Sequence, residues 1–212
     1  MEISNKEVLR YLGYCGAEAD ERLYALIKEI SIVFAENTVP KSVYGIWDCR
    51  VDSSTVELAD LVINSGKLAK HLAGCPRVAL LAVTLGPEAD TLIRRFSVQD
   101  MEKALIAQAV GTVLIEAYCG KIENEIEQKN ELSGLNRTMR FSPGYGDFDI
   151  SHQKDIIDLL NCDRKIGLTL TSGYMLAPSK SLTAVIGFAE EKVQTGGKCE
   201  CNAAKPCEFR GI

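Results

Sequence analysis

Apolar residues recur at spacings of three and four along much of the chain, as they do on one face of an amphipathic helix. These patterns predict helices over 5–12, 17–36, 56–73 and 150–161. In the last of these helices, the residues expected to face inward are Ile150, Ile156, Ile157 and Leu160. The longest pattern covers 99–128, and its apolar stripe consists of Met101, Leu105, Ala109, Val113, Ala117 and Tyr118.

Shorter runs of β-branched and aliphatic residues predict strands. These runs cover 43–47, 77–83, 165–170 and 182–188. Gly86 directly precedes Pro87, which favours a helix that begins at the proline, and a loop is expected over 130–149. The chain contains no internal repeat and no second core pattern. It is therefore predicted to form one α+β domain followed by a short tail.

Size and charge narrow the class of protein. The chain has 212 residues, enough for one sizeable core, and a net charge of −5, which argues against general nucleic-acid binding. The N-terminus lacks the basic start and apolar run of a secretory signal, and the longest apolar run, 78–83, is too short to span a bilayer. We therefore expect a cytoplasmic protein without a membrane partner, whose eight cysteines are reduced thiols or metal ligands.

The segment 140–147, with the sequence Arg-Phe-Ser-Pro-Gly-Tyr-Gly-Asp, concentrates the candidate chemistry. Pro143 fixes its own φ and has no N–H, while Gly144 and Gly146 permit positive φ on either side of Tyr145. These residues predict a shaped loop that presents one aromatic ring and several backbone N–H groups to a ligand. A tight surface turn remains the alternative.

Glu116 is the second candidate, because it falls on the apolar face of the predicted 99–128 helix together with Ala109 and Cys119. A carboxylate is costly to bury without a partner, so Glu116 is expected to face a cation, which is either Arg140 or a bound ligand. The alternative places Glu116 at the edge of the core. The planar guanidinium of Arg140 could bind a ligand carboxylate through two hydrogen bonds. The alternative is a surface ion pair with Asp147 or Asp149.

Other familiar catalytic patterns are missing from the sequence. His71 and His152 lack ligand-like spacing, and His152 is expected to be an exposed residue at a helix start. No Ser-His-Asp arrangement, phosphate loop or dinucleotide fingerprint is present.

The C-terminal tail carries three cysteines within nine residues, Cys199, Cys201 and Cys207. Thiolates this close together in a reducing compartment suggest zinc or an iron–sulfur cluster, with Cys162 as the nearest candidate for a fourth ligand. Free thiols in a tail are the alternative.

Taken together, these motifs resemble a known family. The pattern Arg140-x-x-x-Gly144-Tyr145, followed by a short helix, by 167–171 and by 177–183, is similar to the reactivation domain of vitamin B12-dependent methionine synthase. The similarity is strongest over 100–188, and earlier residues resemble stand-alone members of the family. The resemblance implies a domain over 1–193 and a separate cysteine-rich tail over 194–212.

The resemblance also implies a fold and a site. The fold is a single C-shaped α+β domain, with a mostly antiparallel twisted sheet surrounded by helices. Arg140 would hold the carboxylate of S-adenosylmethionine, and Glu116 would favour its ammonium or sulfonium group. The backbone around Ser142 and Gly144 would shape the site, and Tyr145 would take the catalytic position against the corrin. The adjacent tyrosine pair that follows the last strand in fused members is absent, and the Gly-Tyr pair is followed by Gly146-Asp147 rather than by proline.

The implied function is reactivation of a cobalamin-dependent methionine synthase or a related corrinoid methyltransferase. The chain would act as a methyltransferase component in trans, because it contains no cobalamin-binding Asp-x-His-x-x-Gly segment. Flavodoxin or ferredoxin would donate the electron, and S-adenosylmethionine the methyl group. Two alternatives stay open: an adaptor that binds a corrinoid protein without S-adenosylmethionine chemistry, and an iron–sulfur redox reactivator that uses the tail cysteines.

Overall fold

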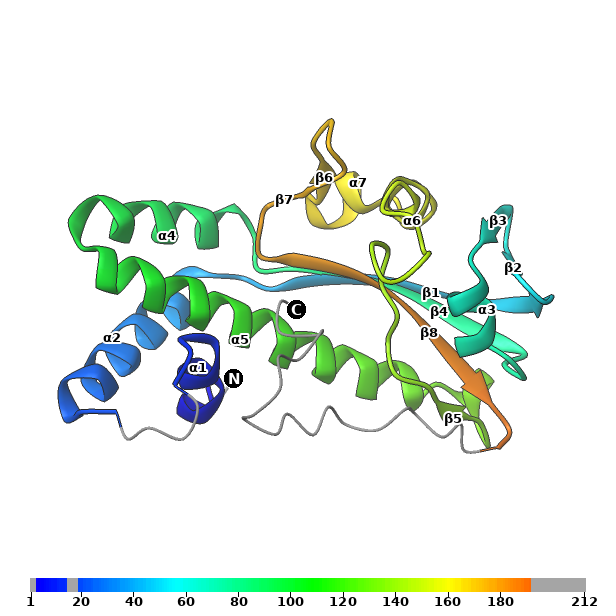
Figure 1. The fold of residues 1–212 in the computed structure, drawn as a ribbon, viewed down its shortest axis with the longest axis horizontal. Helices are drawn as coiled ribbons and strands as arrows, with labels where there is room; N and C mark the ends of the chain where they lie inside the picture. The colour runs from blue at the N-terminus through cyan, green and yellow to red at the C-terminus, as the bar shows by residue number, and fades with distance from the viewer. Residues whose placement is uncertain (1–2, 15–18, 192–212) are drawn as a thin grey trace.

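A six-stranded antiparallel sheet organises the molecule, with strands in the order β3-β2-β1-β4-β8-β5 (Figure 1). The structure is a computed structural model that describes residues 3–14 and 19–191. The strands of this sheet are β1 (Lys41–Val51), β2 (Thr55–Leu58), β3 (Leu61–Asn64), β4 (Arg77–Thr84), β5 (Asn136–Arg137) and β8 (Ser181–Ala189). A separate two-stranded ribbon pairs β6 (Thr169–Leu170) with β7 (Leu176–Ala177).

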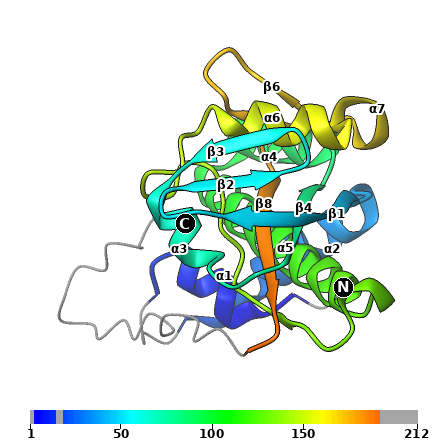
Figure 2. The same ribbon diagram turned by 90° about the vertical axis from the view of Figure 1, so that its right-hand side faces the viewer.

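Helices cover both faces of this sheet. They are α1 (Asn5–Tyr11), α2 (Glu21–Asn37), α3 (Gly66–His71), α4 (Pro87–Gln99), α5 (Met101–Glu127), α6 (His152–Leu160) and α7 (Cys162–Ile166), with a short 3-10 turn η1 (Asn130–Leu132). Figure 2 shows α6 and α7 on one side of the strands and α1 on the other.

The core has two parts because β4 is buried on both faces. Alternate residues of β4, such as Leu81, pack with α1, α2, α4 and α5, and the intervening residues, such as Leu80, pack with α3, α6, α7 and the β2–β3 hairpin. Strand β4 lies between β1 and β8, each antiparallel to it. A strand with two buried faces carries a continuous apolar run, which is the pattern that predicted it.

Helix α5 supports the candidate site. Asp100 caps it by accepting a hydrogen bond from the Glu102 N–H at 2.8 Å. By length and composition α5 could cross a membrane, but 56% of its most apolar window is buried inside the molecule. More than half of that window therefore packs against the sheet and the neighbouring helices.

Most local predictions are confirmed. The predicted strands at 43–47, 77–83 and 182–188 correspond to β1, β4 and β8, and the structure extends the first considerably. Helix α4 begins at Pro87, after Gly86 with φ +86°. The α+β class and the antiparallel sheet are confirmed as well.

The helix predicted over 56–73 is wrong in its first half. The chain instead forms the β2–β3 hairpin, which turns at Ala59 with φ +48°, and only then enters α3. Val56 and Leu58 are buried while Glu57 between them is exposed, so the alternation of a strand was present. Pairing with β1 decides the outcome, and that contact cannot be seen in a short local pattern.

The strand predicted over 165–170 is also wrong. Residues up to Ile166 belong to α7, and Gly167 ends that helix with φ +69°, which leaves only the two residues of β6. The stripe predicted on α5 is wrong at three positions: Met101 is 70% and Leu105 57% exposed, and Ala117 is exposed as well. Ile150 is exposed too, since α6 begins after it.

Candidate functional site

The segment that follows β5 is anchored along the edge of β8. The Thr138 N–H donates to the Gly187 carbonyl at 2.9 Å, and Phe141 exchanges two 2.8 Å backbone hydrogen bonds with Val185. The first half of the motif therefore continues the sheet rather than forming a free surface turn. This pairing places Arg140, which precedes Phe141, where its side chain reaches α5.

The second half of the motif is a glycine-shaped turn held by a helix cap. Gly144 and Gly146 adopt φ of +94° and +60°, which favour glycine. The Asp147 carboxylate accepts the Ser65 hydroxyl at 2.5 Å and the Gly66 N–H at 2.9 Å, at the start of α3. The hydrogen bond from Ser65 is the main reason that the pKa of Asp147 lies below its ordinary value. Asp147 therefore caps a helix.

Arg140 forms ion pairs with two carboxylates of α5. Its Nη1 lies 3.0 Å from Glu123 Oε1, and its Nη2 hydrogen-bonds Glu116 Oε2. Burial alone would lower the pKa of Arg140, but Glu116 and Glu123 outweigh burial and hold that pKa above its ordinary value. The prediction that Glu116 faces a cation is thus confirmed with Arg140 as that cation. The alternative pairing of Arg140 with Asp147 or Asp149 is wrong.

Glu123 is the residue that the sequence-based prediction missed. Its side chain is only 13% exposed, and besides Arg140 it faces Arg137, whose Nη1 lies 3.3 Å from Glu123 Oε2. The Cys119 thiol also donates to Glu123 Oε1 at 3.3 Å. A signal was available: Glu123 follows Glu116 by seven residues, two helical turns, so both carboxylates share one face of α5.

Tyr145 lies beside this charged pair within an aromatic cluster. Its ring centroid is 5.8 Å from that of Phe141, which in turn lies 5.2 Å from the His71 ring. Burial raises the pKa of Tyr145, and the charge of Arg140 opposes that shift. The phenol is therefore neutral, half-buried and close enough to Arg140 and Glu116 to interact with their charges.

His152 does not join the charged pair. It starts α6 as predicted, but its side chain is only 21% exposed and its Nδ1 lies 2.7 Å from Asp155 Oδ2. The expectation that His152 is an exposed residue is therefore wrong.

A small cavity of about 260 Å³ lies between α1 and α5, lined by residues that include Tyr11, Thr112 and Lys180. Thr112 precedes Glu116 by four residues, about one helical turn, so the cavity begins next to the charged pair. Lys180 Nζ donates to Thr112 Oγ1 at 3.0 Å, and no carboxylate of the described residues lies within 4 Å of it. Burial lowers the pKa of this lysine.

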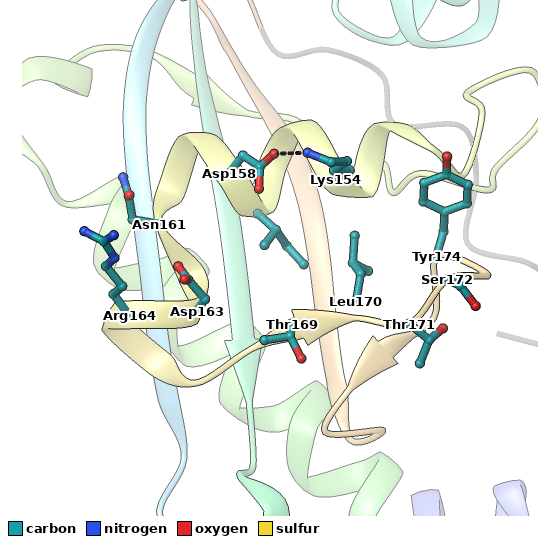
Figure 3. Close-up of a pocket in the computed structure, with 11 residues that line it drawn as sticks. Lys154, Asp158, Asn161, Asp163, Arg164, Thr169, Leu170, Thr171, Ser172 and Tyr174 are labelled. Carbon is teal, nitrogen blue, oxygen red and sulfur yellow. Dashed lines mark hydrogen bonds and ion pairs between the residues drawn. The ribbon is translucent and has the colours of Figure 1, made fainter.

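A larger hollow of about 690 Å³ lies on the opposite face, against α6, α7 and the β6–β7 turn (Figure 3). Its charged lining residues are Lys154, Asp158, Asp163 and Arg164, and the ion pair between Lys154 and Asp158 is more than half exposed on both sides. Glu116, Arg140 and Tyr145 do not line this hollow.

The three tail cysteines, Cys199, Cys201 and Cys207, lie outside the described residues, so their metal site stays a prediction. Cys162, the candidate fourth ligand, is fully buried in the core, and burial raises its pKa to about 12. Cys162 packs as a core residue, and its role as a fourth ligand stays a prediction because the tail cysteines lie outside the described residues. Over residues 3–14 and 19–191, no three His, Cys, Asp or Glu side chains are grouped to hold a metal ion.

The structure is thus an α+β domain in which an ion-paired arginine lies between a sheet edge and a long helix. The chain belongs to the family described as the vitamin B12 dependent methionine synthase activation domain, whose sequence model matches residues 49–196. This match confirms the resemblance carried by the Arg140 motif. The predicted boundary between a domain over 1–193 and a tail over 194–212 stays a prediction.

Comparison with solved structures agrees on the fold. The chain is similar to the crystal structure of the MetH reactivation domain bound to AdoHcy, with a TM-score of 0.69 and 16% sequence identity. The similarity covers 92% of this chain and 76% of that one. At this identity the likeness establishes the architecture alone. No curated protein matches the sequence.

Proposed function

We propose that this chain is a reactivation component that binds S-adenosylmethionine and supports reductive methylation of cob(II)alamin on a partner protein. The partner would be a cobalamin-dependent methionine synthase or a related corrinoid methyltransferase. Membership of the activation domain family supports this role, and so does the similarity to a domain that binds AdoHcy.

The observation that carries the proposal is the juxtaposition of Arg140 and Glu116. The amino-acid end of S-adenosylmethionine carries a carboxylate and an ammonium on one carbon, so it needs a cation and an anion side by side. Arg140 would take the carboxylate through its planar fork, and Glu116 would take the ammonium. Charge-assisted hydrogen bonds of this kind contribute about 1.5–3 kcal/mol each.

The rest of the ligand would extend toward the cavity between α1 and α5. That cavity starts one helical turn from Glu116 and offers the hydroxyl of Thr112, the phenol of Tyr11 and the ammonium of Lys180. These groups suit the hydroxyls and ring nitrogens of an adenosine. Its volume of about 260 Å³ admits part of such a ligand and leaves the sulfonium near Tyr145.

Tyr145 would form the surface between ligand and partner. The positive φ of Gly144 turns the backbone so that the Tyr145 ring packs against Phe141 near the charged pair. A neutral phenol at this place excludes water without adding a charge near the sulfonium. Tyr145 would lie against the partner's cobalamin, which, once reduced by flavodoxin or ferredoxin, would supply the nucleophilic chemistry for methyl transfer.

Calorimetric titration of S-adenosylmethionine into the wild-type protein and Arg140→Ala tests the proposal. We expect measurable binding that weakens at least thirtyfold in Arg140→Ala, as the loss of about 2 kcal/mol implies. The matched control is Arg164→Ala, which removes the same side chain from the larger hollow and should leave binding unchanged. Absence of binding, alone and with a corrinoid protein present, would contradict the proposal.

A reconstitution then separates this function from the two alternatives. The protein, a corrinoid protein in the cob(II)alamin state, reduced flavodoxin and S-adenosylmethionine are mixed under anaerobic conditions. The proposal predicts the visible spectrum of methylcobalamin, dependent on Arg140. An adaptor would bind the corrinoid protein with no effect of S-adenosylmethionine, and an iron–sulfur reactivator would lose activity when Cys201 is changed to Ser.

A further inference from the structure

Glu123 occupies an unusual place between two arginines. Its Oε1 lies 3.0 Å from Arg140 Nη1, and its Oε2 lies 3.3 Å from Arg137 Nη1. Its side chain is 13% exposed, against 33% for the Glu116 side chain. Of the two carboxylates that Arg140 contacts, Glu123 is thus the more enclosed, and each of its oxygens faces a different guanidinium.

Glu116 and Glu123 bind different nitrogens of Arg140. Glu116 uses Nη2, and Glu123 uses Nη1. A ligand ammonium that draws Glu116 away therefore leaves the contact at Nη1 intact. The guanidinium keeps its orientation, and the donors facing Glu116 become available to a ligand carboxylate.

We propose that Glu123 is a positioning residue that holds the Arg140 guanidinium in place for the ligand carboxylate while Glu116 turns to the ligand ammonium. This inference rests on the proposed function, because it assigns the two carboxylates different tasks in binding the same amino-acid group. Glu116 touches the ligand, whereas Glu123 acts only through Arg140.

The surroundings of Glu123 support a fixed position. Cys119 donates its thiol to Glu123 Oε1 at 3.3 Å, from one helical turn earlier on α5. Burial raises the pKa of this thiol to about 12, so Cys119 remains a donor at neutral pH. Arg137 adds a second positive charge, and it faces Oε2 of Glu123, so Oε1 stays with Arg140. Its Nη1 is buried and makes no hydrogen bond of good geometry within the described residues, so it acts by charge.

The charged residues around Glu123 come from two elements. Helix α5 contributes Glu116 and Glu127, and the strand-edge segment contributes Arg137 and Arg140. Glu127 lies 3.8 Å from Arg137 Nε and is 44% exposed, and no salt bridge joins it to Arg140 among the described residues. It is therefore a natural control for the loss of one carboxylate from the same helix.

The test compares two ligands on matched variants. Decarboxylated S-adenosylmethionine lacks the carboxylate but keeps the ammonium and the sulfonium. We expect Glu123→Gln to weaken S-adenosylmethionine about tenfold while changing the affinity for the decarboxylated ligand less than twofold. Glu127→Gln should leave both affinities unchanged. If Glu123→Gln does not fold, Glu123→Asp keeps the charge on a shorter arm and should show the same selective loss.

Three results would overturn the inference, and they differ from failure of the proposed function. Equal weakening of both ligands by Glu123→Gln would reduce Glu123 to a structural residue. An unchanged affinity for S-adenosylmethionine in the folded variant would remove its positioning role. Equal binding of the two ligands by the wild-type protein would show that Arg140 does not hold the carboxylate. Failure of the wild-type protein to bind either ligand would instead contradict the proposed function itself.

Discussion

Each face of the sheet carries a hollow and a set of charged residues, and the two faces differ in how those charges are held. On the α5 face, the side chains of Arg140 and Glu123 are 32% and 13% exposed, and their ion pair joins the segment after β5 to helix α5. In the larger hollow at α6, Lys154 and Asp158 are 63% and 60% exposed and sit four residues apart on one helix. Cavity volume favours the larger hollow, whereas the burial of unlike charges favours the α5 face.

The difference matters because exposed ion pairs contribute little and are screened by salt. A partly buried pair loses hydration, so it persists only where the fold supplies good partners for each charge. The fold supplies them for Arg140 through pairing of the motif with β8 and through the two-turn spacing on α5. The α5 face therefore holds a preorganised group of ion pairs, although its neighbouring cavity is the smaller one.

The largest expected effect concerns Phe148, which packs the turn after Arg140 against helix α6. Phe148 is 1% exposed and packs between Phe141 and His152. Phe148→Ala should lower the free energy of unfolding by about 3–4 kcal/mol, because it leaves a cavity behind the turn. Tyr174→Ala, an aromatic truncation in the larger hollow at 37% exposure, should cost far less. Urea unfolding measures both, and equal losses would contradict the packing described for the motif.

The second effect compares the loss of one arginine from each face of the sheet. Arg140→Ala leaves Glu116 without its cation and Glu123 with Arg137 alone, and should lower the free energy of unfolding by about 2 kcal/mol after discounting for solvent exposure. Arg164→Ala, in the exposed hollow, should change it by less than about 0.5 kcal/mol. Thermal and urea unfolding of the pair of variants provide the measurement. A larger loss for Arg164→Ala would reverse the comparison.

The third effect compares one buried cysteine from each face of the sheet, Cys119 and Cys162. Burial raises the pKa of Cys119 on α5 and of Cys162 on α7 to about 12 in each case. Because the folded pKa exceeds the unfolded value, the stabilisation is complete below about pH 9 and is lost as the pH rises toward 12. At pH 10, ionisation of each thiol in the unfolded state should have lowered the free energy of unfolding by about 1 kcal/mol.

Alanine substitution of each cysteine isolates that loss. Cys119→Ala and Cys162→Ala should both unfold with a shallower decline between pH 8 and 10 than the wild-type protein. A steep decline that persists in one variant would show that its thiol is ionised in the folded state. Both thiols should also resist alkylation at pH 8 until the protein unfolds.

The smallest effect is a gain. Gly120 lies on α5 between Glu116 and Glu123, and a Cβ placed there meets no atom within 4 Å. Gly120→Ala should raise the free energy of unfolding by about 0.5–1 kcal/mol through helix propensity. Affinity for S-adenosylmethionine should stay unchanged in the same variant. A loss of stability in urea unfolding would mean that α5 needs glycine at this position.

The sequence predicts those features of the fold that depend on residues close together in the chain. The start of α4 follows from Gly86 and Pro87, and β4 follows from its unbroken apolar run. Glu116 was found because a carboxylate on an apolar helix face needs a partner. The β2–β3 hairpin was missed since its alternation is too short to outweigh a helical pattern without knowledge of β1.

The partners of the charges were harder to predict because they depend on tertiary contacts. Asp147 is close to Arg140 in sequence, yet it caps α3 at Ser65, some eighty residues earlier. The seven-residue spacing from Glu116 points to Glu123, but its two arginine partners depend on pairing with β8, which aligns Arg137 and Arg140 along α5. Residue types and helical spacing identify which charges need partners, and the sheet register decides which partners they receive.

A crystal structure of the protein with S-adenosylhomocysteine, the product that keeps the amino-acid group, tests the central claim most directly. We predict the ligand carboxylate at the Arg140 guanidinium, the ligand ammonium at Glu116, and the adenosine directed toward Thr112 and Lys180. Glu123 should retain its contact with Arg140. A ligand bound in the larger hollow beside α6, or bound with its carboxylate away from Arg140, would contradict this assignment of the site.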